Sequence, residues 1–135
     1  MSKAIWVERT GKGTFVGKTS DGAEVKIGKA EGMFSPGDLL KIALAGCNIM
    51  SGDARLAAVL GDDYDATVGI SSDYDKESNR YTHMDVEIVA DTTQLSDEER
   101  EQLHRRTRSA IDRQCTVGHT LTQGMDSDLQ FSSDF

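Results

Sequence analysis

The sequence predicts an α+β fold, in which groups of antiparallel strands alternate with two helices of opposite character. Strand-like segments come first as a group of three and then as a group of two, and a helical pattern follows each group. The first helical pattern is apolar on nearly every side, whereas the second carries one narrow apolar stripe among charges. Strands segregated from helices in this way are typical of α+β proteins. The 135 residues are expected to form a single domain, residues 1–135.

Three short strands are predicted in the first thirty residues. Residues 3–9 and 13–19 form the first two, joined by a turn that Gly11 and Gly13 mark. Residues 23–27 form the third. The candidate core side chains of the first two strands are Trp6, Val7, Phe15 and Val16.

The first helix has a strong start signal. Ser35 is the predicted N-cap, and Pro36 fits the first helical position. Asp38 stands three residues after Ser35, which gives a variant of the capping box. The pattern then stays helical to about residue 60, and apolar side chains cover almost every direction around the axis over residues 39–50. A helix that is apolar all round must be buried on all sides, so we expect a second subunit to cover part of it.

Two strands follow this helix. Polar and apolar side chains alternate with a period of two over residues 64–72 and again over residues 83–90. This alternation is typical of an antiparallel sheet with one face in water.

The second helix is predicted to start at Ser96, where Glu99 completes a capping box, and to end near residue 113. Cys115 is therefore expected at the end of this helix or just past it. A last strand is predicted at residues 125–131. The narrow apolar stripe of the helix consists of Leu103, Thr107, Ala110 and Ile111.

Composition excludes several classes of function. The net charge of −8 argues against a nucleic-acid partner, which clustered Lys and Arg would have to bind. Charged and polar residues interrupt every apolar stretch, so no membrane span is expected. The first residues run directly into a strand pattern without a signal peptide. We therefore expect a cytoplasmic protein whose thiols face a reducing environment, where disulfides are usually transient.

The two cysteines are the candidate reactive residues. Cys47 lies inside the apolar helix, and Cys115 follows the charged helix. They do not form a CxxC motif, so a thioredoxin-like or zinc-knuckle arrangement is not indicated. One interpretation is a nucleophilic thiol and a resolving thiol, which reduce an oxidant by forming a disulfide. The other is that Cys47 is a small core residue and Cys115 is incidental.

Other sites fit the sequence less well. Cys115 and His119 are the one pair with close metal-ligand spacing, fewer than the four ligands of structural zinc, so no metal or cofactor is expected. The basic residues within 104–113 match acidic residues at helical spacing, which favours a solvated helix face over an anion site. The segment 11–14, GKGT, lacks the spacing of a P-loop.

Two segments and the order of elements resemble the OsmC/Ohr family of thiol peroxidases. Residues 35–40 read SPGDLL and lead to ALAGC at 43–47, similar to the family's approach to its reactive cysteine. Residues 115–121 read CTVGHTL, similar to its second-cysteine segment. The resemblance implies an OsmC-like fold with antiparallel sheets around a long central helix, in an intertwined homodimer with active sites at the subunit interface. It also implies that Cys47 attacks the peroxide and Cys115 resolves the sulfenic acid.

The resemblance points to two further residues and one departure. The family places an Arg near an early strand turn, and Arg9 matches it here. Burial would raise the pKa of Cys47 and the helix-end field has faded at its position, so the sequence predicts that this cation is needed to hold a thiolate. The family's hydroperoxide reductases usually carry a Glu where this chain has Gly37. Asp38 either substitutes for that Glu or is only the cap partner of Ser35.

The expected function is a Cys-based peroxidase that reduces organic hydroperoxides in oxidative or osmotic stress defence. Apolar neighbours of Cys47 favour an organic peroxide over hydrogen peroxide. The resemblance implies a small dithiol or a lipoyl-type reductant, with no cofactor. The alternative is a non-peroxidase OsmC-like dimer that binds a small apolar ligand at the subunit interface.

Overall fold

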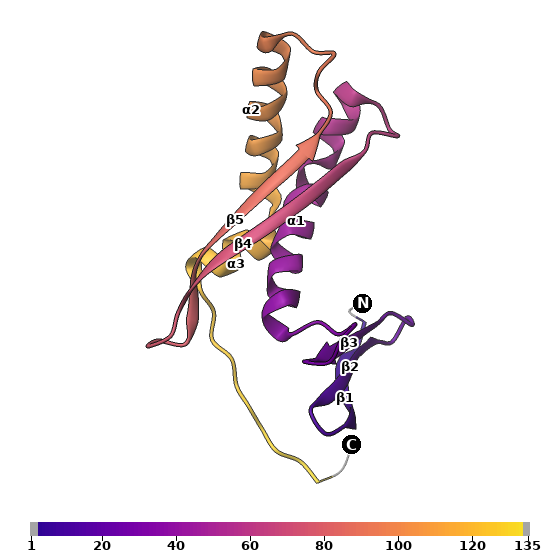
Figure 1. Ribbon diagram of the computed structural model, residues 1–135, viewed down its shortest axis with the longest axis vertical. Coiled ribbons are helices and arrows are strands. Elements are labelled where there is room, and N and C mark those ends of the chain that lie inside the picture. The colour runs from indigo at the N-terminus through magenta and orange to yellow at the C-terminus, as the bar shows by residue number, and fades with distance from the viewer. Residues whose placement is uncertain (1–2, 134–135) are drawn as a thin grey trace. The chain divides into compact units, whose positions relative to one another are not determined.

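The structure, a computed structural model, describes residues 3–133. These residues pack as two compact units, residues 3–43 with 70–84 and residues 44–69 with 85–133. The helices and strands follow the predicted order with one addition and one loss (Figure 1). They are β1 (Ile5–Gly11), β2 (Thr14–Thr19), β3 (Glu24–Gly28), α1 (Pro36–Leu60), β4 (Ala66–Asp75), β5 (Arg80–Ala90), α2 (Asp97–Gln114) and α3 (Thr116–Gln123).

The first unit contains the three-stranded antiparallel sheet, in the order β1-β2-β3. Phe15 pairs with Arg9 on one side and with Ile27 on the other, so β2 is the central strand. Gly13 has a φ of 73°, a left-handed conformation that glycine adopts without strain, and it makes the tight turn between β1 and β2. The three predicted strands are confirmed to within two residues at each end.

Two of the predicted core side chains in this sheet are exposed. Phe15 and Val16 on the central strand are half-buried, as expected for core candidates. Trp6 is 40% exposed and Val7 is 60% exposed, so the prediction that they lie in the core of this chain is wrong. Both lie on the edge strand β1, which pairs on one side only and is exposed along almost its whole length.

Helix α1 begins as predicted, with Pro36 in its first position. The Asp38 N–H donates to Ser35 Oγ at 3.0 Å, and the Ser35 N–H donates to the Asp38 carboxylate at 3.0 Å. These reciprocal bonds form the predicted capping box, which satisfies N–H groups that have no partner inside the helix.

Within the described chain, α1 is buried along one side only. Ala45, Gly52 and Leu56 are its buried residues, whereas Ile42 is 47% exposed and Met50 is 80% exposed. One chain therefore leaves apolar surface of this helix open to water, although the sequence predicts burial on all sides.

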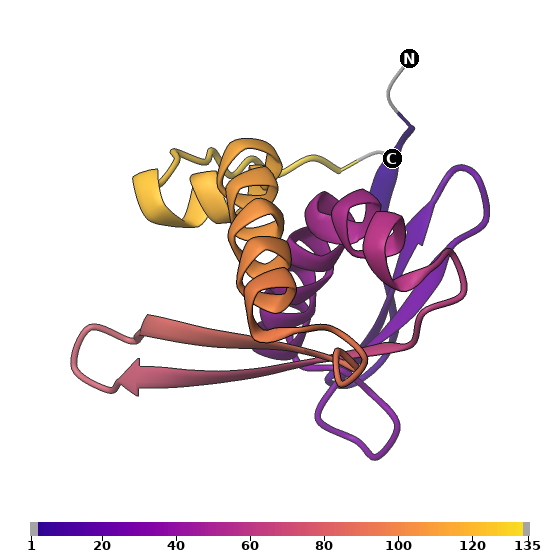
Figure 2. The same ribbon diagram turned by 90° about the horizontal axis from the view of Figure 1, so that it is seen from above.

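In the second unit, the C-terminal half of α1 lies beside α2 (Figures 1 and 2). A glycine lets the two helices approach closely. A Cβ at Gly52 would stand 2.7 Å from Thr107 Cγ2 and 3.3 Å from Ile111 Cδ1. Thr107 and Ile111 of the predicted stripe thus face α1, and Leu103, Thr107 and Ala110 are buried.

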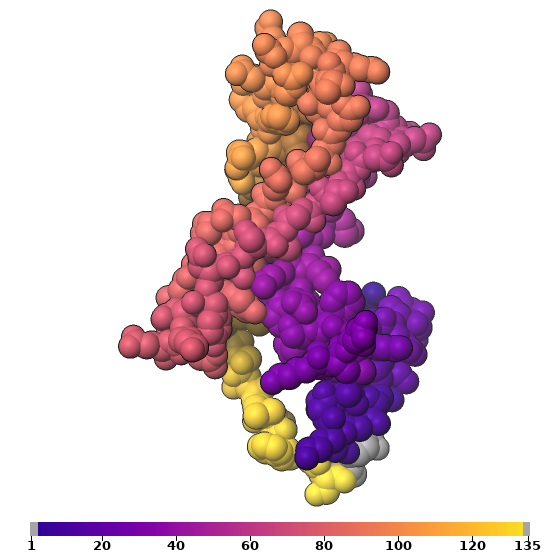
Figure 3. Space-filling model, in the orientation of Figure 1, coloured from indigo at the N-terminus to yellow at the C-terminus, as the bar shows by residue number. Residues whose placement is uncertain are grey.

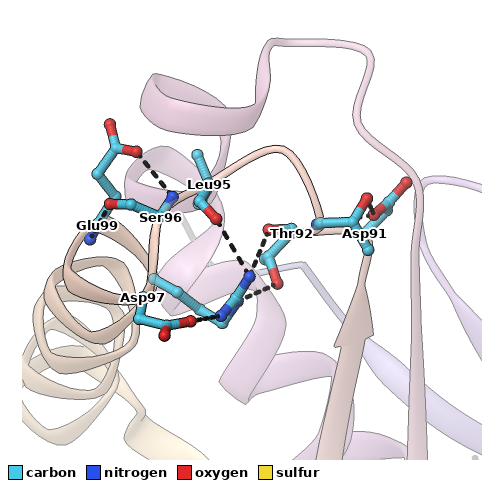
Figure 4. Close-up of polar contacts among 8 residues, drawn as sticks. Asp91, Thr92, Leu95, Ser96, Asp97 and Glu99 are labelled. Carbon is cyan, nitrogen blue, oxygen red and sulfur yellow. Dashed lines mark hydrogen bonds and ion pairs between the residues drawn. The ribbon is translucent and has the colours of Figure 1, made fainter.

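The start of α2 is held by two sets of polar contacts (Figure 4). Ser96 and Glu99 form the predicted capping box, with bonds of 3.1 Å and 2.9 Å. Arg100 reaches back over the preceding turn, where it donates to Thr92 and to the Leu95 carbonyl oxygen and pairs with Asp97 at 2.8 Å. The turn and the first turn of the helix are therefore tied together by one guanidinium.

The chain after α2 differs from the prediction. A third helix, α3, follows Cys115 directly, and no described residue from 124 to 133 belongs to a strand. The predicted strand at 125–131 is therefore wrong for the described chain. Leu129 is 83% exposed and Phe131 is 93% exposed in this extended segment (Figure 3). A strand needs a neighbour for its backbone hydrogen bonds, and the described residues provide none here.

No helix in the described part of the chain is long and apolar enough to cross a membrane.

Candidate functional site: the paired cysteines

The structure brings the two cysteines together within the second unit. Both are free, and they lie close enough that each thiol shifts the pKa of the other. Cys47 is half-buried on α1, and Cys115 is only 3% exposed. Distant positions in the sequence thus form one contact between two sulfur atoms.

Cys115 occupies a junction between two helices. Its N–H donates to the Ile111 carbonyl oxygen at 2.9 Å, so it is the C-cap of α2. Its Sγ accepts the Gly118 N–H at 3.3 Å, so it is also the N-cap of α3. The Asn48 side-chain amide donates to the same sulfur at 3.2 Å. These contacts fix the position of the Cys115 sulfur from three elements.

The first turn of α3 faces Cys47. The Val117 N–H is the main cause that lowers the pKa of Cys47, and partial burial opposes it. The Cys115 thiol, the Thr116 N–H and the Ser51 side chain also lower the pKa by hydrogen-bonding to the sulfur. Free N–H groups and the positive end of the dipole make a helix N-terminus a favourable place for an anion such as a thiolate.

The pKa of Cys115 is shifted in the opposite direction from that of Cys47. Burial raises the pKa of the Cys115 thiol, and its hydrogen bond to Cys47 raises it further. The Gly118 N–H and the Asn48 amide partly offset this effect on the pKa. Cys47 is therefore the more acidic thiol of the pair.

Helix α3 changes the source of thiolate stabilisation. From the sequence a cation is expected, because Cys47 is far from the start of its own helix. The structure also places the first turn of a different helix at Cys47, and its N–H groups lower the pKa of Cys47. Two sequence signals mark α3 in retrospect: Val117 and Leu121 lie four apart, and Gly124 directly follows the last helical residue. Asn48, Ser51, Thr116 and Val117 are the site residues that sequence reasoning missed.

A proline at position 116 is expected to weaken the Cys47 thiolate. Thr116 is the first helical residue after an extended cap, where proline keeps the helix start but removes the N–H. Losing one hydrogen bond to a charged sulfur should slow alkylation of Cys47 by iodoacetamide about tenfold at neutral pH. Because the thiolate is the reactive form, the rate-against-pH curve should move to higher pH. Thr116→Ala keeps the N–H and is the control; identical curves for the two variants would contradict the role of α3.

The other two predicted site residues lie in the first unit. Arg9 is exposed on β1. Asp38 belongs to the capping box of α1, and the Ser35 backbone N–H lowers the pKa of its carboxyl group. The structure thus brings Cys47 and Cys115 together and gives Asp38 a local capping contact.

The structure explains why position 37 is glycine. Any side chain at Gly37 would collide with the hydroxyl group of Tyr81, whose ring lies 5.1 Å from Lys41 Nζ. The family's Glu therefore has no room at this position without displacing Tyr81.

Among the described residues, no group of three or more His, Cys, Asp or Glu side chains is placed to hold a metal ion.

Comparison with known proteins agrees with the fold. Uncharacterized proteins of Mycobacterium tuberculosis and Mycobacterium bovis are 41% identical to this chain over 128 residues, 93% of each protein. A hypothetical protein from Aquifex aeolicus superposes with a TM-score of 0.71 at 17% identity, covering 93% of this chain and 91% of that one. The organic hydroperoxide resistance protein OhrB of Bacillus subtilis superposes with a TM-score of 0.56 at 16% identity, covering 89% and 90%. The model of the OsmC-like protein family matches residues 28–130, and the chain therefore belongs to the OsmC-like family.

Proposed function

We propose that this protein is a Cys-based peroxidase that reduces organic hydroperoxides in defence against peroxide stress. The observation that carries the proposal is the sulfur pair, in which Cys47 faces the N–H groups of α3 and Cys115 donates to it. A core cysteine without chemistry would need neither a lowered pKa nor a second thiol in contact. Membership of a family with Ohr proteins among its structural neighbours supports the same conclusion.

The reaction follows from the different states of the two sulfur atoms. The Cys47 thiolate attacks the outer oxygen of the peroxide, the O–O bond breaks, and the alkoxide leaves as an alcohol after protonation. Cys47 then carries a sulfenic acid. The Cys115 sulfur attacks this sulfenic sulfur, an S–S bond forms, and the hydroxyl group leaves as water with the thiol proton. The amide of Asn48 and the N–H of Gly118 stabilise negative charge on the Cys115 sulfur during this step.

Apolar neighbours of Cys47 support an organic substrate. Leu44 and Ile49 lie within three positions of Cys47 on α1 and are half-buried, and Met50 is 80% exposed. Apolar surface at the nucleophile favours a peroxide with a hydrocarbon part over hydrogen peroxide. A small dithiol or lipoyl-type compound would then reduce the disulfide in a cytoplasmic setting.

The direct test is to treat the reduced protein with one equivalent of cumene hydroperoxide or hydrogen peroxide and to map its disulfides by mass spectrometry. We expect a Cys47–Cys115 disulfide with both oxidants and faster formation with cumene hydroperoxide. If no disulfide forms and Cys47 is unreactive in the folded protein, the proposal is wrong, and Cys47 is a core residue with no chemical role.

Arg9 remains the candidate for a second source of thiolate stabilisation. If its guanidinium contributes, Arg9→Ala should raise the pKa of Cys47, and Arg9→Lys should recover the charge without the forked geometry. Alkylation rate against pH reports that pKa. Curves for Arg9→Ala that match wild type would leave α3 as the stabilising element and would remove Arg9 from the site.

Asp38→Asn separates the two roles considered for Asp38. If the carboxylate only caps α1, the variant should lose about 1 kcal/mol of stability or less and keep its turnover. If it also replaces the family's Glu, turnover should fall sharply in addition to this small loss of stability. Thermal unfolding and steady-state peroxide consumption, measured together, distinguish the two outcomes.

We also propose that two copies of the chain pair through α1. Met50 and Ile42 are large apolar side chains left exposed on this helix, and an obligate interface of this kind usually buries more than about 2,000 Å². Met50→Asp should therefore yield monomers in sedimentation experiments at micromolar concentration. Arg55→Asp places the same side chain at an exposed position of the same helix and is the control. A monomeric wild-type protein would contradict the proposal.

A further inference from the structure

Helix α3 is a short helix that begins at a sulfur atom. None of its eight described residues is buried, and its first turn contains no acidic residue. Its N-cap is Cys115, whose Sγ accepts the Gly118 N–H at 3.3 Å. An isolated helix of this length is at best marginally stable in water. The contacts at its start therefore decide whether α3 forms.

The two cysteines provide the acceptors at this start. The first four N–H groups of any helix have no partner inside it. In α3 one of the four belongs to Cys115 and donates back to the end of α2. A second is the Gly118 N–H on the Cys115 sulfur, and the remaining two, those of Val117 and Thr116, lower the pKa of Cys47. Three N–H groups thus depend on two sulfur atoms.

A disulfide bond would weaken these acceptors. A thiolate is a charged acceptor, and hydrogen bonds to charged groups are about twice as strong as those between neutral groups. In a disulfide neither sulfur carries a charge, and neutral sulfur accepts only weakly. The S–S bond also draws the two sulfur atoms towards each other. Both effects leave the first turn of α3 without good partners for its N–H groups.

Another contact of α3 does not involve sulfur. His119 Nε2–H donates to the Asp112 carbonyl oxygen near the end of α2 at 2.7 Å. This bond is available in either redox state and ties residue 119 to α2. The hydroxyl groups of Thr120 and Thr122 donate to carbonyl oxygens within α3 itself, so they do not anchor the helix to other elements. The part of α3 that depends on the redox state is therefore its first turn.

We propose that α3 is a redox-sensitive element, which is formed while Cys47 and Cys115 are reduced and whose first turn unwinds when a disulfide joins them. The inference rests on the disulfide of the proposed function and adds a change of conformation to it. As the S–S bond forms, the two thiols lose two electrons and two protons, which convert a hydroperoxide into an alcohol and water. Helix α3 leads directly into the segment 124–133, where Leu129 and Phe131 are exposed (Figure 1). The oxidised protein therefore differs from the reduced one at the start of this exposed segment.

Hydrogen exchange measured by mass spectrometry tests the proposal on the wild-type protein. The reduced protein is compared with protein oxidised by diamide, whose N=N bond takes up the two electrons and two protons of the thiols. We expect peptides covering residues 116–123 to exchange at least about tenfold faster after oxidation, because a capping contact and hydrogen bonds to a charged group are lost. Peptides from residues 100–110 of α2 should exchange alike in both forms and are the internal control. Equal exchange of α3 in the two forms would overturn the proposal.

The choice of oxidant separates this proposal from the proposed function. If diamide forms the disulfide and cumene hydroperoxide does not, the proposed function is wrong, and the exchange of α3 still decides the redox-sensitive element. If neither oxidant forms the disulfide, both proposals are wrong.

Two variants test the cause without an oxidant. Cys115→Ala removes the capping sulfur, so α3 should exchange faster in the reduced variant, as it does in oxidised wild type. Cys115→Ser keeps an acceptor at the cap and cannot form the disulfide, so α3 should exchange slowly both before and after treatment with diamide. If α3 exchanges equally slowly in the two reduced variants, the sulfur does not hold its first turn, and the proposal is wrong.

Discussion

If the protein is the peroxidase proposed above, Cys115→Ser is expected to be inactivated by one or two equivalents of peroxide instead of turning over. In the wild-type protein the Cys115 sulfur contacts Cys47, so it can resolve a sulfenic acid as soon as it forms. Without this sulfur, the sulfenic acid persists and oxidises further to sulfinic and sulfonic acids. Mass spectrometry should show additions of two or three oxygen atoms on Cys47, and turnover should stop.

Serine is the informative replacement because Cys115 has a structural role as well. Its Sγ caps α3 by accepting the Gly118 N–H, and serine is among the preferred N-cap residues. Cys115→Ser should therefore keep α3 and the lowered pKa of Cys47, whereas Cys115→Ala loses both the resolving sulfur and the cap. Comparing the two variants separates the loss of resolution from the loss of thiolate stabilisation. Cys47→Ser should not consume peroxide, and if it does, the assignment of the nucleophile is wrong.

Gly52→Ala is expected to destabilise the protein although alanine favours helices. The added methyl group would stand 2.7 Å from Thr107 Cγ2, too close for two carbon atoms, so α1 and α2 would have to move apart. Overpacking of this kind typically costs about 1–3 kcal/mol, more than the gain of about 1 kcal/mol from helix propensity. Thermal or urea unfolding measures the net loss. Because Cys47 is on α1 and Cys115 follows α2, we also expect a slower resolution step.

A double variant tests whether the collision with Thr107 causes the loss of stability. Thr107→Ser removes the methyl group with which the new side chain at position 52 would collide, so Gly52→Ala combined with Thr107→Ser should recover much of the lost stability. Gly46→Ala is the control within the same helix, since its Cβ would meet no described atom within 4 Å. A Gly52→Ala variant as stable as wild type would mean that the two helices adjust freely at this point.

Local signals in the sequence predict most of the elements. The capping boxes at Ser35–Asp38 and Ser96–Glu99 are formed as predicted, because each involves residues only three apart. The alternation in β5 is also confirmed: Val86, Ile88 and Ala90 are half-buried and the residues between them are exposed. Such features depend on a few neighbouring residues and are visible without knowledge of the rest of the chain.

Features that depend on distant residues are the ones that a sequence does not reveal. Trp6 and Val7 look like core residues by composition but are exposed, because β1 is an edge strand that pairs with β2 on one side only. The segment at 125–131 has strand-like residues but no neighbouring strand among the described residues, so its backbone stays unpaired. Helix α3 has only eight residues, too few for periodicity to be clear, and it starts at a cysteine rather than at one of the usual capping residues.

In the candidate site, too, some features follow from neighbouring residues and others depend on residues that are distant in the sequence. Sequence motifs single out Cys47 and Cys115 as the candidate reactive pair, because the residues of each motif are contiguous in the sequence. Which thiol has the lower pKa depends on tertiary packing. The N–H groups of Val117 and Thr116 at the start of α3 lower the pKa of Cys47, while burial raises the pKa of Cys115. A pKa reflects the electric field and the solvation at one point in space, and that field comes from residues that folding brings together from distant parts of the chain.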